Sequence, residues 1–166
     1  MTSAAFRRAG AADAEALLGL ERAASLAALG HVFPADRHPY PSADVLARWH
    51  LVLADPGTTV DVVDGSEAEL ACVVAYDDHG TVRQLAVAPA LWGQGLGTAA
   101  LRHAQERLRA AGHTELRLWC LADNHRARAV YEREGWRPTG ETQPAPWPPY
   151  PTEVGYALGA GPVVEP

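Results

Sequence analysis

The fold is decided by one continuous stretch, Leu85-Ala-Val-Ala-Pro-Ala-Leu-Trp-Gly-Gln-Gly-Leu-Gly-Thr98. The pattern predicts an apolar strand that runs into a glycine-rich turn and then directly into an amphipathic helix. Gly93, Gly95 and Gly97 keep side chains out of the turn, so backbone N–H groups and the positive end of the helix dipole can converge on an anion. The stretch therefore predicts a pyrophosphate site, with a tight turn that serves only helix packing as the alternative.

A nucleotide-binding interpretation competes for the same glycines, because Gly95-Leu-Gly-Thr-Ala-Ala100 matches the dinucleotide fingerprint with alanine as its last member. In that fold the glycines follow the first strand at once. Here about five residues separate Val87 from Gly93, and several strand candidates come earlier in the chain. These features count against a dinucleotide site, and no Gly-Lys-Ser/Thr follows that would make a P-loop.

A second stretch follows the apolar run 116–121 and reads Asn124-His-Arg-Ala-Arg-Ala-Val-Tyr-Glu-Arg-Glu-Gly-Trp136. In this order and spacing, the two stretches together resemble the GNAT superfamily of acyl-CoA-dependent N-acyltransferases over residues 81–136. The resemblance implies a mixed α/β (α+β) fold. Its mostly antiparallel sheet of about six or seven strands would splay between the fourth and fifth strands and be flanked by about four helices.

The resemblance also implies a cofactor, acetyl-CoA, inserted where the sheet opens. Backbone groups of the strand would hold pantetheine and polarise the thioester carbonyl, while N–H groups of the glycine turn would hold the pyrophosphate. The implied cofactor-binding residues are Leu85, Ala86, Val87, Gln94, Gly95, Gly97, Thr98, Asn124 and Arg126. The family often carries Arg or Gln where this chain has Trp92, so Gln94 or Arg126 would have to compensate for that phosphate contact.

Tyr131 is the catalytic residue that the resemblance implies, as the donor of a proton to the departing CoA thiolate. Its phenol suits this role, because an unperturbed pKa of about 10 keeps it neutral at pH 7. Asn124 and Tyr131 are seven residues apart, so two helical turns bring both to one side of a helix. Taken singly, the tyrosine would be a core aromatic and the asparagine a helix cap.

The acceptor is expected to be a primary amine of a small molecule or peptide. An amine of this kind, with a pKa near 10.4, must lose a proton before it attacks. Some family members use a glutamate beside the splay, where this chain has Gln84 and Trp119. The candidate base or substrate-binding residues are Glu21, His31, Phe33, His38, Tyr40 and Trp119, with a water relay as an alternative base. Trp147 and Tyr150 are further aromatic candidates for the pocket wall.

Composition excludes several classes of function. The 166 residues carry a net charge of −6, with 20 acidic against 14 basic residues, which argues against a nucleic-acid surface. The longest apolar run is far shorter than the roughly 20 residues of a membrane span, and the N-terminus lacks a secretory pattern, so a cytoplasmic protein is expected. The histidines show no metal-ligand spacing, and Cys72 and Cys120 are predicted to be buried, reduced thiols.

Organisation along the chain predicts a single domain over 1–158 and a loose tail over 159–166. Strands are expected at 4–8, 58–63, 68–76, 81–87, 116–121 and 153–158, and helices at 13–30, 42–55, 95–112 and 124–134. Asp13 and Ser42 are the predicted N-caps of the first two helices. Six of the 13 prolines fall in 138–151, which is predicted to be a stiff loop.

Two rival functions remain beside acetyl transfer. A non-catalytic acyl-CoA-binding or partner-binding module would keep the fold and lack turnover, and it is suggested by Trp92 and by the missing glutamate base. A nicotinamide-dependent oxidoreductase is the reading that the dinucleotide fingerprint would support. A homodimer is also expected, because dimers are common in the family that the chain resembles.

Overall fold

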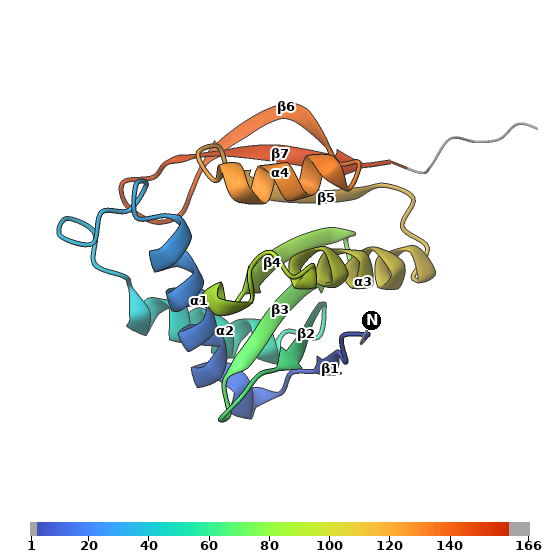
Figure 1. Cartoon of the computed structure of the whole chain (residues 1–166). Helices are drawn as coiled ribbons and strands as arrows, with labels where there is room; N and C mark the ends of the chain where they lie inside the picture. Colours follow the sequence, from blue (N-terminus) through green and yellow to red (C-terminus); the bar gives the residue numbers. More distant parts are fainter. Residues whose placement is uncertain (1–2, 160–166) are drawn as a thin grey trace, which may run out of the picture.

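The computed structural model describes residues 3–159 as seven strands and four α-helices around one sheet (Figure 1). The predicted tail lies outside the described residues from position 160 on. The strands are β1 Arg7–Arg8, β2 Thr58–Asp64, β3 Leu70–Asp77, β4 Thr81–Val87, β5 Leu116–Leu121, β6 Arg137–Pro144 and β7 Thr152–Leu158. The helices are α1 Ala14–Ala28, α2 Ser42–Ala54, α3 Leu96–Ala110 and α4 His125–Arg133, with short 3-10 turns η1 Ala11–Asp13 and η2 Pro89–Leu91.

The strand order across the sheet is β1-β2-β3-β4-β5-β7-β6. All neighbouring pairs are antiparallel except β4 and β5, which are parallel. The expected meander of three strands is formed by β2, β3 and β4. The mixed, mostly antiparallel sheet of the sequence prediction is thereby confirmed.

Two hydrophobic clusters cover the two faces of the sheet, and β3 contributes to both. Its alternate residues Cys72, Val74 and Tyr76 pack with α3 and α4, whereas Val73 and Ala75 pack with α1 and α2. This alternation is the period of two that a strand imposes on its side chains. Because both faces are covered, β3 is buried along its whole length, as its near-continuous apolar sequence requires.

The sheet opens between β4 and β5. The parallel ladder joins only Thr81 to Arg117 and Val82 to Leu118, and the strands diverge beyond those pairs (Figure 1). On its other side β4 stays paired with β3 as far as Val87. The splay expected from the family resemblance is therefore present, and it leaves one edge of β4 without a strand beside it.

One prediction about regular structure was wrong. The proline-rich segment 138–151, expected to be a loop, contains β6 over Arg137–Pro144, which pairs antiparallel with β7. Prolines are tolerated there because β6 is an edge strand, where a missing N–H on the outer side breaks no ladder bond. The register shifts between Pro138 and Thr142, so the pairing is interrupted near the prolines and the sequence pattern of a strand is weak.

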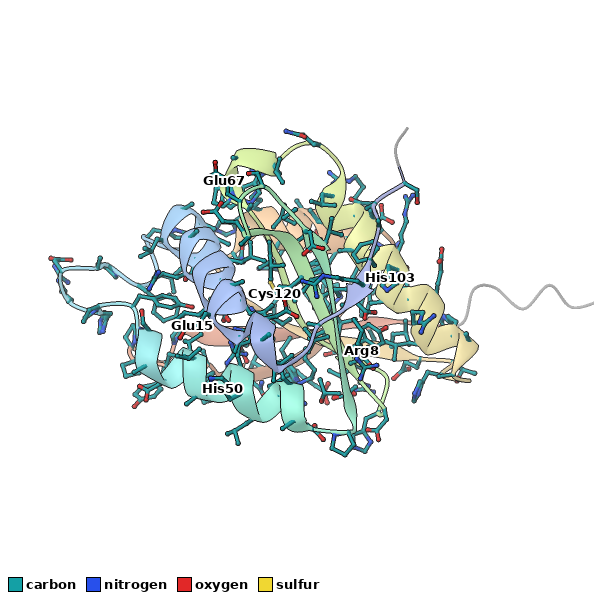
Figure 2. All side chains as sticks on the ribbon, turned by 90° about the horizontal axis from the view of Figure 1, so that it is seen from below. Arg8, Glu15, His50, Glu67, His103 and Cys120 are labelled. Atoms are coloured by element: carbon teal, nitrogen blue, oxygen red, sulfur yellow. The ribbon has the colours of Figure 1, made fainter. Side chains whose placement is uncertain are left out.

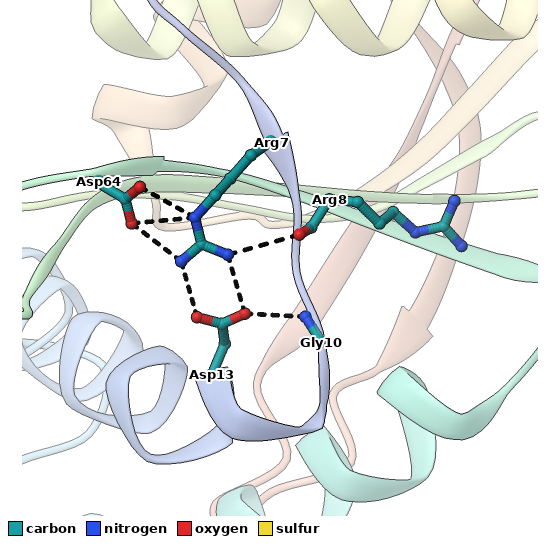
Figure 3. Close-up of polar contacts among 5 residues, drawn as sticks. All are labelled: Arg7, Arg8, Gly10, Asp13 and Asp64. Atoms are coloured by element: carbon teal, nitrogen blue, oxygen red, sulfur yellow. Dashed lines mark hydrogen bonds and ion pairs between the residues drawn. The ribbon is translucent and has the colours of Figure 1, made fainter.

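The predicted N-cap of the first helix is confirmed in its position but not in its side-chain bond. Asp13 is the N-cap residue of α1, but its side chain makes no capping bond. Its carboxylate instead binds the Arg7 guanidinium at 2.8 Å and accepts a hydrogen bond from the Gly10 N–H, and Arg7 also binds Asp64 (Figure 3). The Arg7 guanidinium holds the pKa of the Asp13 carboxyl below its ordinary value. The N-terminal strand is thus tied to α1 and β2, although only Arg7–Arg8 of the predicted 4–8 is strand.

The second cap is displaced by one residue, because Pro41 occupies the N-cap position of α2 and Ser42 is the first helical residue. Cys72 and Cys120 are buried free thiols, as predicted. Over the described residues, no helix has the length and apolar character that crossing a bilayer demands.

Candidate functional site: a cleft where the sheet opens

A cavity of about 1620 Å³ begins in the opening between β4 and β5 and extends to the loop between α1 and α2. This volume exceeds the usual range of about 300–1,000 Å³ for a small-molecule site. The cavity has two halves of different construction. The first, which we call the strand-edge half, is formed by β4, the glycine turn, α4 and most of β5. The second, which we call the loop half, is formed by α1, α2, the loop 29–41, the Trp119 side chain of β5 and the segment before β7.

Backbone groups of β4 supply polar atoms to the strand-edge half. The Ala88 N–H donates to the Ala71 carbonyl at 2.9 Å, which makes that pair a hydrogen-bonded pair of the antiparallel ladder. Since such pairs alternate along a ladder, Ala86 faces β3, whereas the N–H and C=O groups of Leu85 and Val87 face the opening. Of the three predicted residues of this strand, two therefore present their backbone groups to the cavity.

The glycine turn continues directly from this strand edge. Gly93 and Gly95 have φ of +76° and +84°, in the left-handed region where a Cβ is strained. Gly95 is the N-cap of α3, and no side chain caps the helix. The N–H groups of the first turn, which precede the bond from the Ala99 N–H to the Gly95 carbonyl, are therefore free to bind an anion at the positive end of the helix. Gly97 and Thr98 also line the cavity, whereas Gln94 does not.

Trp92 forms one side of the turn. Its indole N–H donates to the Val87 carbonyl at 2.8 Å, and its ring lies under the Arg126 guanidinium, 4.3 Å from the ring centroid to the guanidinium carbon. Arg126 belongs to the first turn of α4, across the opening from β4. Trp92 thus does not disrupt the turn, and the contact with Arg126 joins the two sides of the cleft.

Asn124 and Tyr131 both line the cavity from α4, as the spacing of seven residues predicted. The Asn124 side chain also caps the helix by accepting a hydrogen bond from the Ala127 N–H at 3.2 Å. The Tyr131 ring is 8% exposed and lies against Trp136 and Tyr156, with ring centroids 6.4 and 6.0 Å away. Burial raises the pKa of the Tyr131 phenol above its ordinary value, and neighbouring Cys120 and Tyr156 add to the rise. The phenol therefore stays protonated through the neutral range.

Glu21 is the carboxylate of the loop half. Its Oε2 accepts hydrogen bonds from Arg48 Nη2 at 2.5 Å and from the Trp49 indole N–H at 2.7 Å. Both bonds end on the same oxygen, so Oε1 is left without a donor from the described residues. Burial raises the pKa of the Glu21 carboxyl, while the charge of Arg48 and the Trp49 N–H oppose the rise. The result is a partly buried carboxylate with one oxygen available beside the cavity.

Aromatic rings wall the loop half, as the sequence suggested. Trp119 on β5 lies opposite Gly155 on β7, where a Cβ would come within 3.4 Å of the Trp119 ring. The missing side chain therefore gives the indole room above β7. The other rings that line this half are Phe33, Tyr40 and Trp147, and His38 lines it beside them.

Besides Gln94, two predicted residues of the acceptor side fall outside the cavity lining. His31 is exposed, and its Nε2 lies 2.9 Å from the Asp123 carbonyl, so it links the loop after α1 to the turn before α4. Tyr150 is 59% exposed and does not line the cavity. Conversely, the sequence analysis missed Arg48, which packs over the Trp49 ring and binds Glu21. A signal was available, because Arg48 interrupts the apolar face of the second helix between Val45 and Trp49.

Other polar clusters lie away from the cavity. Tyr76 donates to Asp61 Oδ2 at 2.6 Å, and His103 Nε2 lies 2.8 Å from the same oxygen while its ring stacks on Phe6. Figure 2 places His103 on α3 and the exposed His50 on α2. Within residues 3–159, no group of three His, Cys, Asp or Glu side chains could hold a metal ion.

Comparison with known proteins gives a family match over most of the chain. The model described as Acetyltransferase (GNAT) family matches residues 22–136. A curated relative, the mycothiol acetyltransferase of Nocardia farcinica, is 38% identical over 95 residues, which are 55% of this chain and 30% of that protein. The chain thus spans less than a third of the length of that relative.

Solved structures of low sequence identity share the fold. A GCN5-related N-acetyltransferase from Rhodopseudomonas palustris, described as Aminotransferase, Class-II, has a TM-score of 0.78 at 15% identity and covers 96% of this chain and 97% of its own. The PaiA N-acetyltransferase from Thermoplasma acidophilum in complex with coenzyme A has a TM-score of 0.72 at 13% identity, covering 95% and 99%.

Proposed function

The chain belongs to the Acetyltransferase (GNAT) family, and from this premise we propose that it transfers an acetyl group from acetyl-CoA to a primary amine. The amine attacks directly in a ternary complex, without a covalent enzyme intermediate. One observation carries the proposal. The edge of β4 at Leu85 and Val87 has no strand beside it and leads straight into a left-handed glycine turn at a bare helix N-terminus.

These residues fit acetyl-CoA, which supplies the acetyl group as an activated thioester. The strand edge offers the N–H and C=O groups of Leu85 and the N–H of Val87 to the amides of the pantetheine arm, in the manner of an added strand. The first turn of α3 offers N–H groups to the pyrophosphate, and Gly97 has only van der Waals room beside Val87, where a Cβ would be 3.5 Å from Cγ2. Backbone donors cost no side-chain ordering when they bind.

Tyr131 holds the proton that the leaving sulfur needs. Its hydroxyl Oη keeps that proton at neutral pH, because burial raises the phenol pKa. The same burial destabilises a thiolate that forms beside it, so the proton can move from Oη to the sulfur. The phenolate left behind takes a proton from solvent once CoA has left. Tyr131 therefore acts as a general acid in the proposal.

Glu21 is the residue that we assign to the incoming amine. Its free Oε1 can accept a hydrogen bond from an ammonium group, and its raised pKa makes it a better base than an exposed glutamate. The aromatic walls of the loop half suit a cationic acceptor. His38 also lines this half, whereas His31 is linked to the Asp123 carbonyl and does not.

The acceptor class follows from the loop half and from the curated relative. The acceptor of the mycothiol acetyltransferase is the first member of the panel to test. Polyamines, amino acids and a peptide amine complete the panel. A small acceptor is favoured because aromatic rings and the Glu21 carboxylate line the loop half together.

The test is calorimetric titration with acetyl-CoA, followed by thiol-release assays with the amine panel. The proposal expects binding below millimolar concentration and CoA release that depends on an amine. Binding without turnover on any amine would instead support the non-catalytic module. NADH serves as the control ligand, and tight NADH binding without acetyl-CoA binding would contradict the proposal and favour an oxidoreductase.

A further inference from the structure

The loop before α3 lacks a cation, and a cation from α4 is held next to it. Trp92 occupies the loop position, and its half-buried ring is fixed by the hydrogen bond from its indole N–H to the Val87 carbonyl. The Arg126 guanidinium lies over this ring, 4.3 Å from its centroid. The ring is therefore a fixed platform, and the guanidinium is the part of Arg126 that it orients.

Within the described residues, the contact with the Trp92 ring leaves the guanidinium N–H groups without a hydrogen-bond acceptor. Arg126 is exposed, and within the described residues no carboxylate pairs with it. Arg128, two residues later on the same helix, differs in this respect, because it donates to the Tyr156 hydroxyl and to the Ala122 carbonyl, both at 2.9 Å. The guanidinium of Arg126 thus has N–H donors available for an anion, whereas donors of Arg128 are already used within the protein.

The guanidinium of Arg126 faces the same cavity as the glycine turn. Trp92, Gly95 and Arg126 all line the strand-edge half. An anion bound by the first turn of α3 would lie between the helix N-terminus and the guanidinium, which are both positive. A fixed guanidinium also loses less side-chain freedom on binding than a mobile one.

We propose that Trp92 is a positioning residue that holds Arg126 to bind the diphosphate of CoA, so that the cation comes from α4 and not from the loop. This inference rests on the proposed function, because it concerns the same cofactor. Of the two residues expected to compensate for Trp92, it selects Arg126, and it adds that Trp92 itself positions the guanidinium. The diphosphate is the assigned partner, and the 3′-phosphate at the far end of CoA is the alternative that the test distinguishes.

The experiment measures the dissociation constants of CoA and 3′-dephospho-CoA by calorimetry for the wild type, Trp92→Leu, Arg126→Gln and the double variant. Each single change is expected to weaken both ligands by about tenfold, and the double variant by little more than either alone, because the two side chains act as one unit. Arg8→Gln, an exposed arginine on β1, is the control and should bind as the wild type does.

Two more variants separate orientation from folding. Trp92→Phe keeps an aromatic ring but loses the N–H bond that fixes it, so its loss of affinity should be smaller than that of Trp92→Leu. Trp92→Arg in the Arg126→Gln background returns a cation to the loop and should restore CoA binding. Circular dichroism of each variant should match the wild type.

Three results would overturn the inference. They are wild-type affinity in Trp92→Leu, fully additive losses in the double variant, and a loss seen with CoA but absent with 3′-dephospho-CoA, which would assign Arg126 to the 3′-phosphate. Failure of the wild type to bind CoA would be a different outcome, because it would contradict the proposed function itself.

Discussion

The two halves of the cavity are built by different means. The strand-edge half uses backbone groups of β4 and α3, which follow one another within residues 85–98. The loop half uses side chains of Glu21, Arg48, Trp119 and Trp147, which meet from four separate parts of the chain. Backbone recognition tolerates changes of side chain, whereas recognition by side chains changes with every substitution. The binding surface of the strand-edge half can therefore stay the same when side chains change, whereas side-chain changes in the loop half would alter the choice of the proposed acceptor.

The largest effect that would test this division is expected for Tyr131→Phe. Loss of a general acid lowers kcat by about 10²-fold or more, while CoA affinity stays within about twofold because the strand edge and the glycine turn are unchanged. Steady-state kinetics and calorimetry give the two values. Trp136→Phe, at a neighbouring ring that does not line the cavity, is the control for altered packing. Wild-type turnover in Tyr131→Phe would remove the assigned role.

A smaller loss is expected for Glu21→Gln, about 10- to 100-fold in kcat/KM, with CoA binding kept. The carboxyl accepts a proton only when ionised, and burial raises its pKa. The wild-type rate should therefore fall as the pH drops through that raised pKa, and the variant should lack this acid limb. The pH profile of kcat/KM provides the measurement.

His38→Gln is the matched control for Glu21, since both residues line the loop half. An unchanged acid limb in Glu21→Gln together with its disappearance in His38→Gln would transfer the role of base to the histidine. Such a result would leave the division between the two halves intact and would alter only the chemistry of the loop half.

Gly95→Ala tests the strand-edge half directly. A residue other than glycine at a φ of +84° costs about 1–3 kcal/mol, although no atom lies within 4 Å of the added Cβ. We expect a lower free energy of unfolding and CoA affinity weaker by about tenfold, because the turn relaxes away from the left-handed region. Gly19→Ala in α1, which also has no atom within 4 Å of the added Cβ, should keep or raise stability. Equal effects of the two changes would show that the turn does not need its conformation.

The smallest expected effect is that of His31→Gln. The bond to the Asp123 carbonyl positions the loop of the acceptor side, so its loss should raise the KM for the amine by about threefold and leave kcat and CoA affinity unchanged. Initial rates at varied amine concentration measure this. A large fall in kcat would instead make His31 part of the chemistry.

The strand-edge half could be predicted from the sequence because its parts are contiguous. The strand, turn and helix over 85–98 appear in the printed order, and the spacing of Asn124 and Tyr131 fixes their common side. The direction of the Ala86 backbone groups could not be predicted, because it depends on the register with β3. Trp92 was expected to remove a phosphate contact from the loop. Its contact with Arg126 could not be predicted, because only the fold brings the two residues together.

For the loop half, the sequence predicted which acidic and aromatic residues contribute, but not which side chains contact one another. Glu21 and Arg48 pair across 27 positions, and no local pattern links them. Strand β6 was missed because its prolines suppress the strand signal at a sheet edge, where a proline is tolerated. His31 was grouped with the acceptor residues on sequence position alone, and its side chain turns to another loop.

The two-pair ladder between β4 and β5 has a consequence for the stability of the whole molecule. The β5-β7-β6 portion is joined to the rest of the sheet by a seam of only two residue pairs, so its docking should be weak where the strands part. A molecule bound between β4 and β5 would contact both portions of the sheet and would hold them together. Occupancy would then act as a thermal stabiliser, and the melting temperature should rise with each tenfold increase of ligand above its dissociation constant.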